Sequence, residues 1–127
     1  MQKTVFVVDD IIPNLDDASN ALEAEFSLYT MGSVEKMFHL LENMTPDLIL
    51  MDVEIPGEYN LNATVKLKKN PLWKNIPIVY YTGVDKECLW PRAMILGVHD
   101  VLKKPCPPER LRRYVKGYIM ACERLSS

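Results

Sequence analysis

The sequence predicts an α/β fold: a doubly wound parallel sheet of five strands, flanked by five helices. Two observations support it. Short apolar and β-branched runs, such as Thr4 to Val8 and Leu48 to Met51, are typical of strands buried on both faces of a parallel sheet. The segments between such runs carry apolar residues at helical spacing. Strict alternation of strand and helix favours a layered sandwich with helices on both sides of the sheet.

The first half of the chain is expected to form strand, helix, strand and helix. After the first strand, Pro13 suits the opening turn of a helix that extends to about Glu25. A short strand follows from Ser27 to Met31. Gly32-Ser33 then supplies a turn and an N-cap for a second helix, whose apolar residues keep a helical period: Val34, Met37, Phe38 and Leu41.

The third and fourth strands are expected on either side of a third helix. The strand that ends at Met51 is followed by Pro56-Gly57, a loop signal, and by a helix from about Leu61 to Lys69. Asn70-Pro71 ends this helix, because the residue before a proline is disfavoured in helical conformation. The fourth strand is expected from Ile76 to Thr82.

The segment from about Asp85 to Leu96 has helical character but contains Pro91. An internal proline removes a backbone hydrogen bond and clashes with the preceding turn, so we expect this helix to be short, late-starting or kinked. Gly97 ends it. The last two elements are a strand and a helix: Val98 to Leu102, and a helix that opens at Pro107-Pro108 and runs to about Arg124.

Composition indicates an ordinary globular protein with one domain over residues 1–127. The net charge of −2 gives no general attraction to nucleic acid or to anionic membranes. Every apolar run is shorter than the ~20 residues of a membrane span, and Met1-Gln2-Lys3 leads directly into a strand. We therefore expect a cytoplasmic protein that contacts neither membrane nor nucleic acid.

Three carboxylates stand at the ends of two predicted strands. Asp9 and Asp10 close the first strand, and Asp52 closes the third. In open α/β sheets, ligands bind beyond the carboxyl ends of the strands. Crowded carboxylates repel one another, so such a cluster is expected to hold a hard cation that neutralises it. Mg²⁺ is the natural candidate.

Thr82 and Lys104 are expected to face the same crevice, because they follow the fourth and fifth strands. Carboxylates, a hydroxyl and an ammonium form a set suited to phosphoryl transfer, in which positioning and charge neutralisation dominate. Asp52 would attack, Mg²⁺ would bridge carboxylate and phosphoryl oxygens, and Lys104 and Thr82 would bind the remaining oxygens.

These residues, at these spacings, resemble the receiver domains of bacterial response regulators, over essentially the whole chain. The motifs that support the resemblance are Asp9-Asp10, Asn14, Asp52 with Ile55-Pro56-Gly57, Thr82-Gly83 and Lys104-Pro105. The resemblance implies a flavodoxin-like fold with strand order 2-1-3-4-5, as in single-domain chemotaxis regulators. It implies that Asp52 accepts phosphate from a histidine kinase or a phosphotransfer protein. Beyond its own phosphorylation and dephosphorylation, such a domain catalyses no reaction.

The same resemblance implies a role for each site residue. Asp10 and Asp52 would ligate Mg²⁺ directly, together with the backbone carbonyl of Glu54, while Asp9 would act through water. Lys104 would form a salt bridge with the acceptor or the phosphoryl group, and the Thr82 hydroxyl would move toward that group. The Lys104-Pro105 peptide bond would be cis.

Several positions depart from the family pattern. Val101 stands where receivers usually carry Tyr or Phe, so the usual coupled movement of that aromatic ring with the Thr hydroxyl cannot occur in its common form. Tyr59-Asn60 replaces a frequent Asp-Gly, although Asn tolerates positive φ. Pro91 alters a helix that often forms half of the output surface. These changes concern signal transmission more than the phosphoacceptor.

The favoured function is therefore a phosphorylation-dependent switch, a monomer or weak homodimer, that binds a downstream protein partner. The basic residues of the last helix are interpreted as a solvated face: Arg110, Arg112, Arg113 and Lys116.

Two alternative functions stay open. A pseudo-receiver would bind a partner without phosphate control, and Val101 supports it. An aspartyl-phosphate hydrolase is disfavoured, because Asp52 is not part of an Asp-x-Asp motif near the first strand. Whether the chain is part of a longer protein also stays open.

Overall fold

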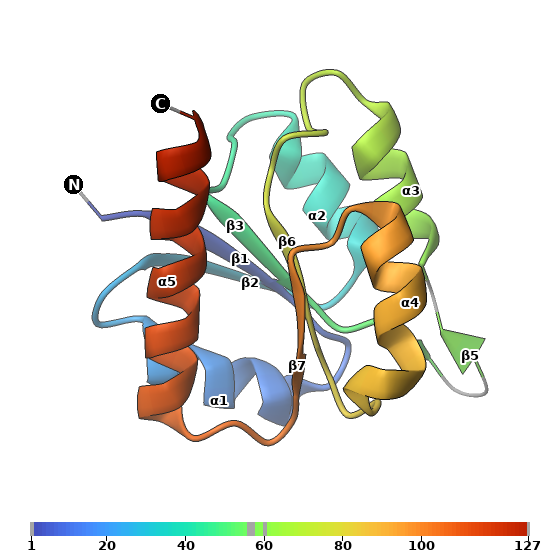
Figure 1. Cartoon of the computed structure of the whole chain (residues 1–127). Coiled ribbons are helices and arrows are strands. Elements are labelled where there is room, and N and C mark those ends of the chain that lie inside the picture. Colours follow the sequence, from blue (N-terminus) through green and yellow to red (C-terminus); the bar gives the residue numbers. More distant parts are fainter. Residues whose placement is uncertain (1, 56–57, 60, 127) are drawn as a thin grey trace.

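The computed structural model describes residues 2–55, 58–59 and 61–126. Five strands form one parallel sheet in the order β2-β1-β3-β6-β7. Their bounds are β1 (Thr4–Val8), β2 (Ser27–Met31), β3 (Leu48–Met51), β6 (Ile78–Thr82) and β7 (Asp100–Lys103). Because β6 and β7 are the fourth and fifth strands of this sheet along the chain, the predicted order 2-1-3-4-5 is confirmed (Figure 1).

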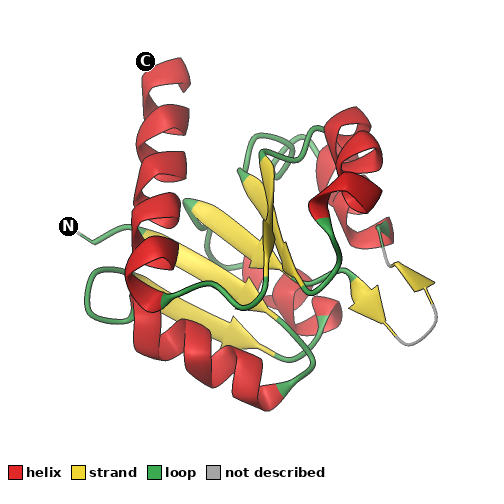
Figure 2. Ribbon diagram, turned by 60° about the horizontal axis from the view of Figure 1, so that its bottom comes forward, coloured by secondary structure: helices red, strands yellow, loops and turns green. Residues whose placement is uncertain are grey.

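Five helices cover the two faces of the sheet (Figure 2). Helices α1 (Ile12–Leu22) and α5 (Pro108–Ser126) pack on one face. Helices α2 (Val34–Leu41), α3 (Asn62–Lys69) and α4 (Lys86–Leu96) pack on the other. The predicted doubly wound α/β sandwich is thereby confirmed. Within the described residues, no helix is both long and apolar enough to cross a membrane.

Alternation along the strands builds two separate cores. In β1, Val5 and Val7 enter the core beneath α1 and α5, whereas Phe6 and Val8 enter the core beneath α2, α3 and α4. In β6, neighbouring tyrosines divide in the same way, with Tyr80 toward α3 and α4 and Tyr81 toward α1 and α5. Side chains on a strand point alternately to opposite faces, which explains why these central strands are apolar at every position.

The predicted capping residues act as expected. The Ser33 hydroxyl accepts a hydrogen bond from the Lys36 backbone N–H at 3.2 Å and so caps α2. Pro13 lies in the first turn of α1. Gly97 ends α4 with φ of 81°, a left-handed conformation that glycine adopts without steric cost.

The helix around Pro91 was expected to be short, late-starting or kinked, and the first two of these alternatives are wrong. Helix α4 spans 11 residues, from Lys86 to Leu96, and Pro91 lies inside it. The proline removes only the bond to the Glu87 carbonyl, near the start of the helix. Leu89 and Ala93, both fully buried, anchor this helix on the sheet, and such packing supplies most helical stability in proteins.

A short feature after β3 was not predicted. Two-residue strands β4 (Glu54–Ile55) and β5 (Glu58–Tyr59) pair in antiparallel fashion. The predicted Pro56-Gly57 loop and the positive-φ tolerance of Asn60 lie outside the described residues. Other boundaries shift by a few residues: α1 ends at Leu22 rather than near Glu25, and β7 begins at Asp100 rather than Val98.

Candidate functional site

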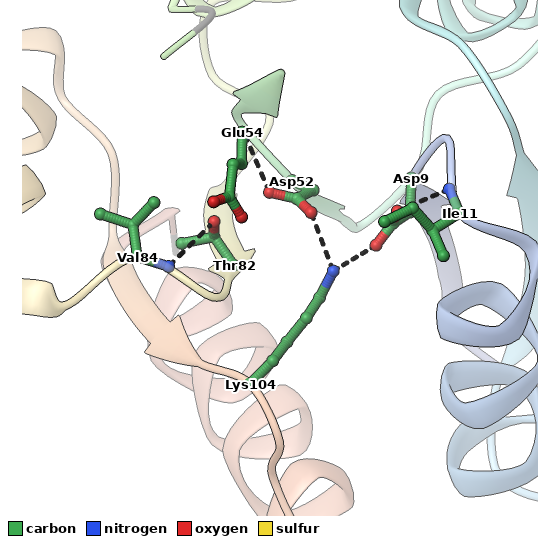
Figure 3. Close-up of polar contacts among 7 residues, drawn as sticks. All are labelled: Asp9, Ile11, Asp52, Glu54, Thr82, Val84 and Lys104. Atoms are coloured by element: carbon green, nitrogen blue, oxygen red, sulfur yellow. Dashed lines mark hydrogen bonds and ion pairs between the residues drawn. The ribbon is translucent and has the colours of Figure 1, made fainter. Parts of the chain in front are cut away.

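The carboxyl ends of the strands bring the predicted site residues together (Figure 3). Asp9 follows β1 and Asp52 follows β3, and these two strands are neighbours in the sheet. Thr82 ends β6, and Lys104 follows β7, the next strand outward. The Lys104 backbone N–H donates to the Thr82 carbonyl at 2.8 Å, so the ladder continues up to the site.

Lys104 bridges the two inner carboxylates. Its Nζ donates to Asp52 Oδ2 at 2.9 Å and also to Asp9 Oδ2. The three side chains are only 14%, 7% and 4% exposed for Lys104, Asp52 and Asp9. Lys104 comes from a position 52 residues beyond Asp52 and 95 beyond Asp9, so it is the parallel sheet that brings these distant positions together.

Local turns hold the remaining oxygen of each carboxylate. Asp9 Oδ1 accepts from the Ile11 backbone N–H at 2.9 Å, and Asp52 Oδ1 accepts from the Glu54 backbone N–H at 2.9 Å. Each aspartate thus points one oxygen at its own loop and the other at Lys104 (Figure 3). The carboxylates are fixed in orientation before any ligand arrives.

Lys104 stays protonated in this environment. Burial acts to lower the pKa of its ammonium, but hydrogen bonds and charges from Asp9 and Asp52 outweigh burial and raise the pKa above its ordinary value. Two carboxylates face one ammonium, so an excess of negative charge remains. That excess favours an added cation.

The predicted metal ligands line one cavity of about 200 Å³, which contains Asp9, Asp10, Asp52 and Glu54. Asp10 is exposed, unlike Asp9. Oxygen donors of this kind fit a hard cation such as Mg²⁺. Across the described residues, no three Asp, Glu, His or Cys side chains stand close enough together to hold a metal ion. Lys104 donates a hydrogen bond to one oxygen of Asp9 and to one oxygen of Asp52. It therefore competes with a metal ion for these two oxygens.

Thr82 lies on the side of Asp52 that is away from Asp9 (Figure 3). It is fully buried, and its hydroxyl accepts a weak hydrogen bond from the Val84 backbone N–H at 3.4 Å. Next to it, Gly83 lies beside Glu54: a Cβ at position 83 would be in ordinary van der Waals contact with Glu54 Oε2, at 3.4 Å. The Lys104-Pro105 peptide bond is cis, as the family resemblance implied.

Two residues near the site were not predicted. Glu35, in the first turn of α2, lines the same cavity as Asp10. The Tyr81 ring lies against Lys104, with Nζ 5.4 Å from the ring centre. Strand alternation offered a signal for Tyr81, because the residue before Thr82 must face α1 and α5 rather than α2 to α4. Glu35 follows Ser33, the N-cap of α2, and α2 starts just after β2. Because β2 pairs with β1, this position close to the end of β1 was the signal for Glu35.

The arrangement suits nucleophilic chemistry on an anionic group. Asp52 presents a carboxylate whose orientation is fixed, and Lys104 offers an ammonium beside it. Acidic oxygens that suit a cation line the adjoining cavity. Phosphoryl transfer needs this combination of nucleophile, positive charge and positioning.

The sequence and the fold both match known proteins. The sequence model of one family, described as response regulator receiver domain, matches residues 5–116. The phosphate regulon transcriptional regulatory protein PhoB of Pseudomonas aeruginosa is 28% identical over 118 residues, which cover 92% of this chain and 52% of that protein. The sensory transduction protein LytT of Bacillus subtilis is 30% identical over 118 residues, covering 90% and 47%. The chain spans about half the length of these curated relatives.

Solved structures show the same architecture. A CheY-like response regulator receiver domain protein from Methanospirillum hungatei superposes with a TM-score of 0.85 at 22% identity, with 98% of each chain covered. A response regulator from Thermotoga maritima gives a TM-score of 0.84 at 24% identity, over 94% of this chain and 99% of the other. At such identities these structures support the fold alone, whereas the family match spans most of the sequence. The chain belongs to the family of response regulator receiver domains.

Proposed function

We propose that this chain is a phosphorylation-dependent switch in a two-component system, with Asp52 as the phosphoacceptor. The observation that supports it is the buried contact of Lys104 with Asp52 and Asp9 at the ends of three strands. An ion pair that served only stability would need one carboxylate for Lys104. Here Asp9, Asp52 and a third carboxylate, Asp10, line one cavity. Receiver domains are signalling modules of two-component systems and interact with histidine kinases and downstream effectors.

In the proposed reaction, an Asp52 carboxylate oxygen attacks the phosphorus of a phosphohistidine on a histidine kinase or phosphotransfer protein. The new P–O bond forms as the P–N bond breaks, and the imidazole, already protonated on its other ring nitrogen, takes the electron pair and leaves as the neutral ring. Lys104 then moves its hydrogen bond from Asp52 to a phosphoryl oxygen, while Asp9 keeps the ammonium in place. The Thr82 hydroxyl, whose hydrogen bond from the Val84 backbone N–H is long at 3.4 Å, can turn toward the phosphoryl group.

Receiver domains generally use Mg²⁺ for phosphorylation. Here Asp10, Asp52 and the backbone carbonyl of Glu54 would hold the ion, with Asp9 acting through water. Bound Mg²⁺ would neutralise charge on the phosphoryl oxygens. Asp10 suits this role because it is exposed in the cavity and is not engaged by Lys104.

The proposal includes the wider role of the chain. It is a single domain over residues 1–127 that acts in the cytoplasm as a monomer or weak homodimer. Its output is contact with a protein partner or onward transfer of the phosphoryl group, without direct binding to nucleic acid. Val101 is fully buried where receivers usually place an aromatic, so transmission must use other side chains.

Intact-mass measurement after exposure to a small phosphodonor with Mg²⁺ tests this proposal. We expect one phosphoryl group on the wild type, and none with EDTA or in Asp52→Asn. No addition under any condition would refute the switch. Binding to a partner that is unchanged in Asp52→Asn would then support a pseudo-receiver.

A further inference from the structure

We propose that Tyr81 is a positioning residue for Lys104, holding the ammonium where it serves both the free and the phosphorylated Asp52. The inference rests on the proposed phosphoacceptor function and adds a residue to it. It starts from the contact between the Tyr81 ring and the Lys104 ammonium, 5.4 Å apart. A cation within about 6 Å of a ring centre is attracted by the negative face of the ring.

The Tyr81 ring is itself firmly held. Tyr81 lies in the central strand β6, is 8% exposed, and packs in the core formed with α1 and α5. Burial raises the pKa of its hydroxyl, and the neighbouring backbone of Cys106 acts in the opposite direction. The side chain therefore lies near both ends of the segment Lys104-Pro105-Cys106, with its face toward the ammonium and its hydroxyl near the Cys106 backbone.

A ring suits this task better than a polar side chain. During phosphorylation the Asp52 oxygens change from a carboxylate to an acyl phosphate, so Lys104 must exchange hydrogen-bond acceptors. The ring attracts the ammonium without taking a conventional acceptor site. All three N–H donors of Lys104 remain available to Asp9, Asp52 or phosphoryl oxygens. Contact with Tyr81 can persist unchanged while the other contacts are exchanged.

A cavity beside the ring shows what Tyr81 prevents. It has a volume of about 490 Å³ and is lined by Asn14, Asp17, Tyr81, Lys104 and Cys106 among others. A smaller side chain at position 81 would widen this cavity toward Lys104. The flexible lysine could then turn toward the Asp17 carboxylate and away from Asp52.

Rates of phosphorylation by a small phosphodonor, with saturating Mg²⁺, provide the first test. We expect Tyr81→Leu to react about 3- to 10-fold more slowly than wild type, in line with the strength of a partly desolvated cation–π contact. Tyr81→Phe keeps the ring and should stay within about twofold of wild type. Leu102→Ala is the matched control, because Leu102 pairs with Tyr81 in the sheet and lines the same core. It should lower stability without slowing the reaction.

A double-mutant cycle distinguishes positioning from a general structural effect. If Tyr81 acts through Lys104, Tyr81→Leu should have no further effect in a Lys104→Ala background. An equal loss in both backgrounds would overturn the proposal. So would a Tyr81→Phe variant as slow as Tyr81→Leu, since the hydroxyl rather than the ring would then matter.

An NMR measurement tests the contact without any reaction. The ε-methylene protons of Lys104 should be shifted upfield by the Tyr81 ring in wild type and Tyr81→Phe, and the shift should vanish in Tyr81→Leu. A normal shift in wild type would overturn the inference. Failure of the wild type to be phosphorylated would instead refute the proposed function, and the NMR comparison would still decide whether the ring holds the ammonium.

Discussion

Lys104 compensates the charge of two nearly buried carboxylates, so its removal has a predictable cost. In Lys104→Met, Asp9 and Asp52 would face each other without a cation. We expect the free energy of unfolding in EDTA to fall by about 3 kcal/mol, the usual scale for a buried charge left unpaired. Urea unfolding measures this loss, and Mg²⁺ should restore part of it by neutralising the same oxygens.

Lys103→Met is the matched control for that substitution. Lys103 also pairs with an aspartate, Asp85, but both side chains are more than half exposed. Exposed ion pairs contribute at most about 1 kcal/mol. If both lysine variants lose the same stability, the charge balance assigned to Lys104 is wrong.

Asp100 offers a test of pH dependence at the junction of three elements. Burial acts to raise its pKa, but hydrogen bonds from Lys86, Tyr118 and the Val101 backbone N–H outweigh burial and lower it. A carboxyl whose folded pKa is depressed adds stability above its unfolded pKa, near 3.8, and loses it as pH falls through the folded pKa. Asp100 should therefore contribute to acid unfolding below about pH 4.

Thermal unfolding from pH 7 to pH 2 tests this contribution. Asp100→Asn should be less stable than wild type at pH 7, and the difference should shrink as pH falls below about 4. Asp85→Asn serves as the control, because the Asp85–Lys103 pair is more than half exposed and should contribute little. A constant difference between Asp100→Asn and wild type over this range would contradict the assignment.

At the scale of elements, Pro91 shows how packing overrides local preference. The sequence correctly indicates that a proline is unfavourable in a helix interior, yet α4 runs through it. Local rules cannot weigh this cost against the burial of Leu89 and Ala93, which depends on the finished sheet. The same limit explains why β4 and β5 were not predicted, since two-residue strands leave no periodic pattern.

Pro91→Ala should therefore stabilise the protein. The substitution restores a backbone donor for the Glu87 carbonyl, and Pro91 is exposed, so little packing is lost. We expect the free energy of unfolding to rise by about 1–2 kcal/mol, after allowing for the greater freedom of the unfolded alanine chain. Urea unfolding measures it, with Ile95→Ala, at a position 84% exposed, as a neutral control. An unchanged or lower stability would mean that the proline is accommodated without cost.

At the scale of the whole molecule, topology accounts for how much of the site the sequence could predict. Asp9, Asp52, Thr82 and Lys104 were recognisable because each ends a predicted strand, and a parallel sheet brings such ends together. The family resemblance implied the salt bridge between Lys104 and Asp52, but the other partners of these side chains were not recognisable. That Lys104 contacts Asp9 as well as Asp52, and lies against Tyr81, follows from side-chain packing across three strands. Sequence spacing contains no such information.

The negative charge left at the strand ends predicts that Mg²⁺ stabilises the entire fold. A ligand that binds only the folded state raises the free energy of unfolding by about 2.7 kcal/mol at 100 times its dissociation constant. Asp10→Ala isolates this effect. Asp10 is exposed and Lys104 contacts other carboxylates, so the variant should match wild-type stability in EDTA within about 0.5 kcal/mol.

Thermal unfolding of both proteins over a Mg²⁺ titration gives the decisive comparison. The wild-type melting temperature should rise with Mg²⁺, whereas Asp10→Ala should respond only at much higher concentrations. Ca²⁺ should substitute poorly for Mg²⁺. The proposed ligands are two carboxylates, one backbone carbonyl and water, and this small set suits the octahedral Mg²⁺ better than the larger Ca²⁺, which takes more oxygen ligands from the protein. An equal rise in both proteins would place the cation elsewhere, and would leave Asp10 as a solvated residue at the edge of the Lys104 ion pairs.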